Sequence, residues 1–383
     1  MTIGVPRETH PGERRVALTP AVLEMLRRHK FEVLIEHGAG QAAGFPDGAY
    51  EAKGARVTSR DGVFAAEAVV RVRAFQSGGE RNRADFERLR PGQFLIGMFD
   101  ALWRSRQEME ELAAAGVTSL ALDLMPRISR AQAMDVLSSM ATIAGYKAAL
   151  LAAAHLHKML PMLMTAAGTI PPARVLVIGA GVAGLQAIAT ARRLGAVVEA
   201  YDVRPAVKEQ VQSLGARFLE LPLEAGEDSS GYAQAQDEAF QQRQRELMAR
   251  AVASSDAVIT TASVPGRRAP LLITAGMVER MQPGSVIVDL AAEHGGNCEL
   301  TRPDETVAAH GVIILGPTNL PATVPYDASQ MYARNLTAFL LHLAPEGALR
   351  LDAEDVILRE TMLTREGEVV HPRLRQRVRL AAD

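Results

Sequence analysis

The chain has 383 residues, 48% hydrophobic and 22% charged, a composition typical of folded globular proteins that excludes wholesale disorder. Its formal net charge of −2 offers no electrostatic basis for binding nucleic acid or an anionic membrane surface, so we expect no nucleic-acid partner. The single cysteine, Cys298, excludes a disulfide within the chain and suits a reducing, cytoplasmic compartment.

Short apolar runs alternate with helical patterns along almost the whole chain, which is typical of parallel α/β units. In the first third we expect strands at 3–5, 32–35, 68–72, 94–98 and 117–120, with helices at 20–28, 60–65 and 104–114. A long helical pattern over about 131–160 is expected to connect two domains. The methionines between 159 and 164 are expected to fill core space.

The second array of α/β units is clearer in the sequence. We expect strands at 175–178, 197–202, 257–260, 285–289 and 312–315, and helices at 182–194 and 207–214. A helix from about Asp327 leaves this domain, and we expect the tail to return to the first. The predicted fold is therefore α/β with two Rossmann-like, doubly wound parallel-sheet domains. The first is discontinuous (1–140 plus 330–383), and the second spans 141–329.

The most informative motif is a glycine-rich turn between an apolar strand and an amphipathic helix. Gly179, Gly181 and Gly184 form the spacing GxGxxG at that junction. There the first glycine permits the tight turn, the second lets the backbone approach a pyrophosphate, and the third lets the helix pack closely on its strand. The sequence therefore predicts one dinucleotide site.

An acidic residue stands where such a site binds the adenosine ribose. Asp202 ends the next strand, 18 residues after Gly184, close to the ~20 expected of the ribose-binding acid. A carboxylate accepts hydrogen bonds from both ribose hydroxyls and repels a 2′-phosphate, which favours NAD(H). Arg204 leaves NADP(H) open at this point, because a nearby arginine can accommodate that phosphate.

A second polar group lies at the start of the long helical pattern. Arg127, Gln132, Asp135 and Ser138 interrupt a stretch that is otherwise apolar, at a strand-to-helix junction where α/β folds place their sites. Two interpretations are equally consistent with these residue types: a binding group, or a capping box in which Ser129 caps the helix with Gln132 three residues on.

Other chemistry-bearing residues receive plain interpretations. His155 and His157 are two positions apart, point to different faces of a helix and do not form a metal pair. No metal-ligand spacing is present, and we expect no metal. The acidic, aperiodic segment at about 221–239 is too long for an ordinary connection, so we expect a functional loop there.

These features belong to a resemblance that covers nearly the whole chain. Its segments are VPRETHPGERRVALTP, LMPRISRAQAMD, MTAAGTIPPARVLVIGAGVAGLQAIATARRLGA, SGYA and PGSVIVDLAAEHGGNCE. On these the chain resembles the NAD(H)-binding component, domain I, of proton-translocating NAD(P) transhydrogenases, in the form that is a separate soluble alpha subunit. That family belongs to the alanine dehydrogenase superfamily. RISRAQ-x-MD is the most specific segment, because it separates this family from its relatives.

The resemblance implies direct hydride transfer from NADH on this chain to NADP⁺ on a partner subunit, coupled to proton movement through a membrane subunit. It also implies a homodimer that is cytoplasmic and associated with the inner membrane through its partners. Beside the dihydronicotinamide it places Arg127, Gln132, Asp135 and Ser138. To the NAD pocket it assigns Val182, Asp202, Val203 and Arg204, and on weaker matches Gly231, Gln244 and Ser263. Tyr232 matches the tyrosine of the family's closing loop.

Two other functions remain open. An alanine dehydrogenase has a similar N-terminal region, and Arg15 matches its carboxylate-binding arginine. That enzyme also uses a lysine, a histidine and an aspartate. Here 69–73 contains no lysine, Met98 stands where the histidine falls, and Glu293 replaces the aspartate. The other alternative is a regulatory NAD-sensing module without turnover.

Overall fold

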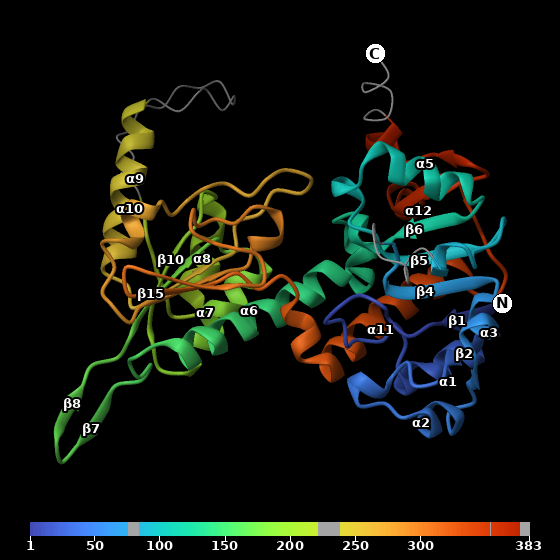
Figure 1. The fold of residues 1–383 in the computed structure, drawn as a ribbon, viewed down its shortest axis with the longest axis horizontal. Helices are drawn as coiled ribbons and strands as arrows, with labels where there is room; N and C mark the ends of the chain where they lie inside the picture. Colours follow the sequence, from blue (N-terminus) through green and yellow to red (C-terminus); the bar gives the residue numbers. More distant parts are fainter. Residues whose placement is uncertain (76–83, 221–237, 353, 376–383) are drawn as a thin grey trace. The chain divides into compact units, whose positions relative to one another are not determined.

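The chain folds into two compact units in a computed structural model that describes residues 1–75, 84–220, 238–352 and 354–375. The first unit comprises Met1–Met140 and Pro321–Asp383, and the second comprises Ala141–Leu320 (Figure 1). Each unit contains its own sheet, in which parallel pairs predominate. Both are Rossmann-like α/β architectures, as the sequence predicts.

The described part of the first unit contains an eight-stranded sheet in the order β17-β16-β6-β5-β4-β1-β2-β3. Its strands are β1 (Thr2–Val5), β2 (Glu32–Glu36), β3 (Arg56–Thr58), β4 (Ala68–Arg73), β5 (Phe94–Met98), β6 (Thr118–Ala121), β16 (Met362–Arg365) and β17 (Glu368–Val369). The strands from β1 to β6 pair in parallel, whereas β16 and β17, from the end of the chain, add antiparallel. All five strands predicted for this third of the chain are confirmed.

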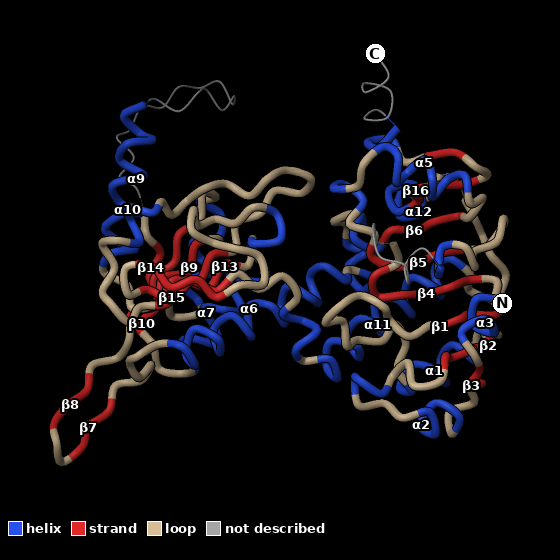
Figure 2. The backbone as a smooth tube through the Cα atoms, in the orientation of Figure 1, coloured by secondary structure: helices blue, strands red, loops and turns tan. Residues whose placement is uncertain are grey.

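Helices cover this sheet, as Figure 2 shows around β4, β5 and β6. They are α1 (Pro20–Arg28), α2 (Asp47–Glu51), α3 (Arg60–Phe64), α5 (Arg106–Ala114), α11 (Pro325–Leu343) and α12 (Val356–Thr361), with 3₁₀ segments η1 (Gln41–Ala43), η2 (Ala101–Trp103), η3 (Leu122–Leu124), η4 (Ser129–Met134) and η7 (Leu320–Thr323). Because both faces are covered, the first five residues of β4 are buried. The helix α11 contributes a long buried face that includes Tyr332, Leu336 and Leu340.

The second unit contains a seven-stranded sheet among its described residues, in the order β11-β10-β9-β12-β13-β15-β14. Its strands are β9 (Arg174–Ile178), β10 (Val197–Tyr201), β11 (Arg217–Phe218), β12 (Ala257–Thr260), β13 (Val286–Asp289), β14 (Thr306–Ala309) and β15 (Val312–Leu315). Only β14 is antiparallel among these described pairs. The chain moves outward from β9 to β11 and then resumes on the other side at β12. That reversal makes the carboxyl ends of β9 and β12 the expected ligand crevice of a Rossmann sheet.

The helices of the second unit are α7 (Val182–Arg193), α8 (Lys208–Ser213), α9 (Glu238–Ala253) and α10 (Ala275–Val278), with 3₁₀ segments η5 (Pro205–Val207) and η6 (Ala292–His294). Beside them a two-stranded hairpin, β7 (Leu163–Thr165) and β8 (Gly168–Ile170), projects away from the sheet (Figure 1). Met162 is 59% exposed and Met164 is 80% exposed. The expectation that these methionines fill core is therefore wrong, because the segment forms an isolated ribbon.

The connecting helix is shorter than predicted. The pattern over 131–160 predicts one helix, but α6 spans Val136–His155 and the 3₁₀ segment η4 precedes it. Asp135 lies between them with φ −76° and ψ 91°, outside helical geometry, so its side chain can cap α6. Among the described residues, α6 is the one helix long and apolar enough to span a membrane by length and composition alone. Its alanines 148, 149 and 152 are buried in the core of the second unit.

Candidate functional site

The glycine-rich turn has the geometry that its sequence predicts. Gly179 has φ +99°, and a Cβ there would stand 2.5 Å from Oγ1 of Thr261. At Gly184 a Cβ would stand 1.8 Å from the carbonyl oxygen of Gly179, so only glycine allows α7 to pack this closely. At Gly181, in contrast, a Cβ would meet no heavy atom within 4 Å. Two glycines are thus required by packing, and the third faces open space at the start of α7.

That open space is suited to an anion. The first amides of a helix have no acceptor within it, and the helix dipole adds partial positive charge at the same end. Gly181 is the N-cap of α7, a helix of 12 residues, and no side chain caps it among the described residues. The start of α7 can therefore receive a phosphate group, with no side chain at position 181 in the way.

Asp202 follows β10 and is tied to the turn. Its carboxylate accepts hydrogen bonds from the backbone N–H of Ala180 (2.7 Å) and of Arg204 (2.8 Å). The Arg204 guanidinium donates two more through Nε and Nη2, both at 2.9 Å. Burial acts to raise the pKa of Asp202, but these donors outweigh it and hold that pKa below its ordinary value. Asp202 is therefore a charged acceptor beside the turn, and a ribose hydroxyl must compete with Arg204 for it.

The other residues predicted for the pocket are apolar or exposed. Val182 is 42% exposed and Val203 is 73% exposed, and Ser263 is exposed in the loop after β12. Gly231 and Tyr232 lie outside the described residues. Gln244 falls within α9, but its side chain is outside the described part.

The loop after β12 is held against the turn by residues that the sequence patterns did not reveal. Thr261 donates from Oγ1 to the carbonyl oxygen of Gly179 at 3.0 Å. The Asn297 amide donates to the carbonyl oxygens of Ala262 and Pro270, both at 2.9 Å, and accepts from the N–H of Ala262 at 3.1 Å. Asn297 therefore fixes both ends of the loop that carries Ser263.

Asn297 is in turn fixed by a buried carboxylate. Asp289, 0% exposed at the end of β13, accepts hydrogen bonds from the backbone N–H of Ala291, Asn297 and Cys298. It also accepts from the hydroxyls of Thr260 and Thr301 at 2.9 and 2.8 Å. These five bonds satisfy a buried charge without a cation. The positions of Thr260 and Asp289 at adjacent strand ends are the one sequence signal that could have pointed to this network.

In the first unit, the polar loop (residues 127–138) follows β6 and leads into α6. Ser138 donates from its backbone N–H (2.9 Å) and from its hydroxyl (2.6 Å) to the Asp135 carboxylate. The predicted capping box at Ser129 is wrong, since η4 has Ile128 at its N-cap position and no side-chain cap. Asp135 and Ser138 supply the cap instead, and Arg127 and Gln132 remain exposed. The structure thus brings together two of the four predicted residues.

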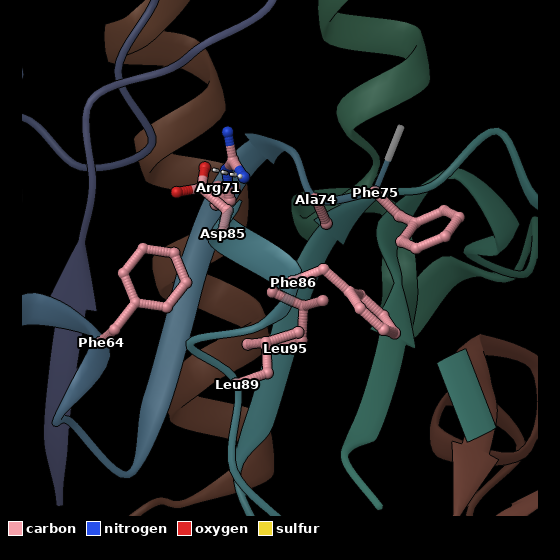
Figure 3. A pocket seen from close by; sticks show the side chains of 8 residues that line it. All are labelled: Phe64, Arg71, Ala74, Phe75, Asp85, Phe86, Leu89 and Leu95. Atoms are coloured by element: carbon pink, nitrogen blue, oxygen red, sulfur yellow. Dashed lines mark hydrogen bonds and ion pairs between the residues drawn. The ribbon is translucent and has the colours of Figure 1, made fainter. Parts of the chain in front are cut away.

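Enclosed space elsewhere does not provide a nucleotide site. A cavity of about 20 Å³ in the first unit is far below the roughly 300–1,000 Å³ of ligand pockets. It is lined by Phe64, Arg71, Ala74, Phe75, Asp85, Phe86, Leu89 and Leu95 (Figure 3). Arg71 and Asp85 point toward one another there and form an ion pair at 3.1 Å. A wider hollow of about 550 Å³ lies at the amino ends of β5 and β6, away from the carboxyl ends where α/β sheets bind ligands.

The strand order, the glycine-rich turn and the acid after β10 define a Rossmann-type dinucleotide site at the switch point of the second sheet. Two family models match the chain: "Alanine dehydrogenase/PNT, N-terminal domain" over residues 4–144 and "Alanine dehydrogenase/PNT, C-terminal domain" over residues 148–372. The chain belongs to the alanine dehydrogenase/PNT family.

Relatives of known name lie on both sides of that family. The chain is 46% identical to an NAD(P) transhydrogenase subunit alpha of Rhodospirillum rubrum, over 98% of this chain and 99% of the relative. It is 32% identical to an alanine dehydrogenase of Mycobacterium tuberculosis, over 98% and 96%. A solved structure of a transhydrogenase from Sinorhizobium meliloti matches with a TM-score of 0.84 at 41% identity, covering 97% of this chain and 100% of that one. The transhydrogenase side of the family is the better match.

Proposed function

We propose that the chain binds NAD(H) across the glycine-rich turn, with the pyrophosphate at the start of α7 and the adenosine ribose on Asp202. The open space beside Gly181 carries this proposal, because a nucleotide needs close backbone approach there. The pocket takes Val182, Val203 and Arg204 as further contacts, and Gly231, Tyr232, Gln244 and Ser263 by resemblance. Asp202 favours NAD(H) over NADP(H), since its charge repels a 2′-phosphate.

The proposed reaction is transfer of a hydride from C4 of NADH on this chain to C4 of NADP⁺ on a partner subunit. The hydride carries both electrons, so NADH becomes NAD⁺ and NADP⁺ becomes NADPH, and no proton moves in this step. Transfer requires the two carbons to approach within about 3–3.5 Å. The chain accordingly needs groups that orient the ring and exclude water, and no general acid or base. The names of the transhydrogenase relatives support this assignment.

In this proposal the polar loop holds the dihydronicotinamide end. Asp135 and Ser138 form a fixed pair at the start of α6, with 2.6 and 2.9 Å hydrogen bonds, that can orient the ring substituents. The exposed Arg127 and Gln132 can reach ligand atoms without leaving a buried position. Gln132 faces the second nucleotide by resemblance. These roles are orienting roles, consistent with a step that moves no proton.

The test mixes the purified chain and NADH with an NADP⁺-loaded partner subunit and follows NADPH formation. We expect transfer in the wild type. In Gln132→Asn, which shortens the side chain by one methylene and keeps the amide, we expect slower transfer with NADH affinity close to normal. Ser129→Ala is the control, since that exposed side chain makes no cap. NADH oxidation without any partner subunit would contradict the proposal.

Alanine dehydrogenation is the weaker alternative. It needs a free arginine for the substrate carboxylate, but Nε and Nη2 of Arg15 bind the Glu13 carboxylate at 2.7 and 2.6 Å, and the Arg15 side chain is 2% exposed. Adding pyruvate, ammonia and NADH tests this activity directly, and we expect no NADH consumption. Binding of NADH without reaction in either assay would support the sensing module.

The assembly is proposed as a homodimer that docks to an NADP(H)-binding subunit and, through it, to a membrane proton-channel subunit. The chain would then be cytoplasmic and peripheral to the inner membrane. The hairpin β7–β8 supports self-association: an isolated two-stranded ribbon is at best marginally stable in water. It also exposes Met162, Met164 and Ile170 (59%, 80% and 40%), the kind of apolar surface that a second chain covers.

A further inference from the structure

The polar loop is anchored from below by two apolar side chains. Ala131 is 0% exposed and Met134 is 8% exposed. They are three residues apart in η4, and a 3₁₀ helix has three residues per turn, so they share one face. Gln132 and Ala133 are exposed on the remaining faces. Burial of one face fixes how η4 is rotated but leaves it free to slide along its axis.

A polar contact from the other end of the chain fixes that axial position. Asn335, in the middle of α11, donates a hydrogen bond from Nδ2 to the carbonyl oxygen of Ala133 at 2.7 Å. The two residues are 202 positions apart in sequence. The Ala133 carbonyl directly follows Gln132 along the backbone, so this bond determines where Gln132 stands.

Asn335 is an unfavourable choice for packing alone. It is 8% exposed, and its Oδ1 is buried with no hydrogen-bond partner among the described residues. A buried acceptor without a partner is destabilising, and asparagine is a poorer helix former than leucine. An apolar side chain of the same size would fill the space without either cost. The bond to Ala133 is what asparagine adds at this position.

A second tether joins the same loop to the helix α12. Nη2 of Arg130 lies 3.3 Å from the Asp355 carboxylate, with side chains 62% and 12% exposed. Asp355 also contacts the His342 ring on α11 and caps α12 through the N–H of Ile357 at 2.9 Å. Asp355 is therefore fixed, but the exposed Arg130 makes this tether the weaker of the two.

We propose that Asn335 is a positioning residue for hydride transfer: through the Ala133 carbonyl it sets the place of Gln132 against the dihydronicotinamide, with Arg130–Asp355 as the secondary tether. This inference rests on the proposed function. It assigns to the C-terminal part of the chain a role in the reaction, whereas the predicted nucleotide-binding residues lie in the second unit.

The test is Asn335→Leu, which keeps the volume and removes the donor. Ala133 is exposed, so its carbonyl can turn to water, and the unpaired Oδ1 is gone. We therefore expect an equal or higher melting temperature, and an NADH Kd within about twofold of wild type because nucleotide affinity comes mainly from the second unit. Hydride transfer at saturating NADH should fall about 10- to 100-fold, the effect of a displacement near 1 Å on oriented groups. A purely structural residue would not separate these readouts.

Thr337→Val is the matched control. Thr337 lies on the same helix, is 2% exposed, and its hydroxyl also has no partner among the described residues, but it does not bond to the polar loop. We expect melting temperature, NADH affinity and turnover to stay at wild-type values. Arg130→Met, an exposed change, should lower turnover about two- to fivefold with NADH affinity unchanged.

Wild-type turnover in Asn335→Leu, or a loss no larger than its loss of folded protein, overturns the inference. If that variant does not fold, unchanged turnover in Arg130→Met overturns it. A wild-type chain that binds no NADH, or binds it without transfer to the NADP⁺-loaded partner, refutes the proposed function itself.

Discussion

Replacing Asp202 by alanine tests the nucleotide site, because this carboxylate is the one charged group fixed against the glycine-rich turn in the described structure. It accepts four hydrogen bonds, two from backbone N–H groups and two from Arg204. The ribose diol can approach once the guanidinium turns away, which Arg204, with its side chain 56% exposed, is able to do. Binding therefore exchanges two guanidinium bonds for two hydroxyl bonds.

That exchange sets the size of the expected loss. A hydrogen bond to a charged group contributes about 1.5–3 kcal/mol net. Two such bonds form with the ribose, but two with Arg204 are given up, so we expect the net value of one, about 1.5–3 kcal/mol. At about 1.4 kcal/mol for each factor of ten, the NADH Kd should rise about 10- to 150-fold in Asp202→Ala. NADPH should lose less or gain affinity, since the charge that repels its 2′-phosphate is gone.

The assay is a fluorescence titration of NADH and NADPH with wild type, Asp202→Ala and Asp202→Asn. The asparagine variant keeps an acceptor for the Ala180 N–H, so it controls for disturbance of the turn. An NADH Kd within twofold of wild type in Asp202→Ala would refute the assignment. Because the pKa of Asp202 lies below its ordinary value, its contribution is present above that value and lost only as pH falls through the lowered one. NADH affinity should accordingly show no loss from this group between about pH 5 and 8.

Two further predictions follow from single positions. Gly181→Ala should keep the wild-type melting temperature, since its Cβ meets nothing within 4 Å, yet weaken NADH binding by obstructing the pyrophosphate; Gly184→Ala should lower the melting temperature as well, since its Cβ would stand 1.8 Å from a carbonyl oxygen. Equal melting temperatures in the two variants would contradict this distinction. Met164→Asp places a charge on the exposed hairpin and should shift sedimentation toward monomer, with Met25→Asp, an exposed methionine on α1, as control; a dimer in both would exclude the hairpin as the interface.

The sheets could be predicted because parallel strands buried on both faces leave a strong signal. Runs such as VLVI in β9 and VIVD in β13 are buried at every apolar position. The strands that were not predicted are β3, β11 and β17, which have two or three residues each, and the antiparallel strands β14 and β16. Such short or peripheral strands have little apolar pattern, and their pairing is decided by neighbours far away in sequence. The end of the connecting pattern failed for a related reason: Asp135 adopts non-helical geometry that no periodicity encodes.

The candidate site divides along the same physical line. The turn and Asp202 are predictable because one strand, one turn and the next strand place them, all within 24 residues from Gly179 to Asp202. The loop residues around them depend on Asn297, 35 positions from Ala262, and the polar loop depends on Asn335, 202 positions from Ala133. An asparagine inside a helix or after a buried strand has no local pattern that marks its partner. Residues that contact a nucleotide can therefore be found from sequence, whereas residues that hold those contacts in place become visible only once the fold brings their partners together.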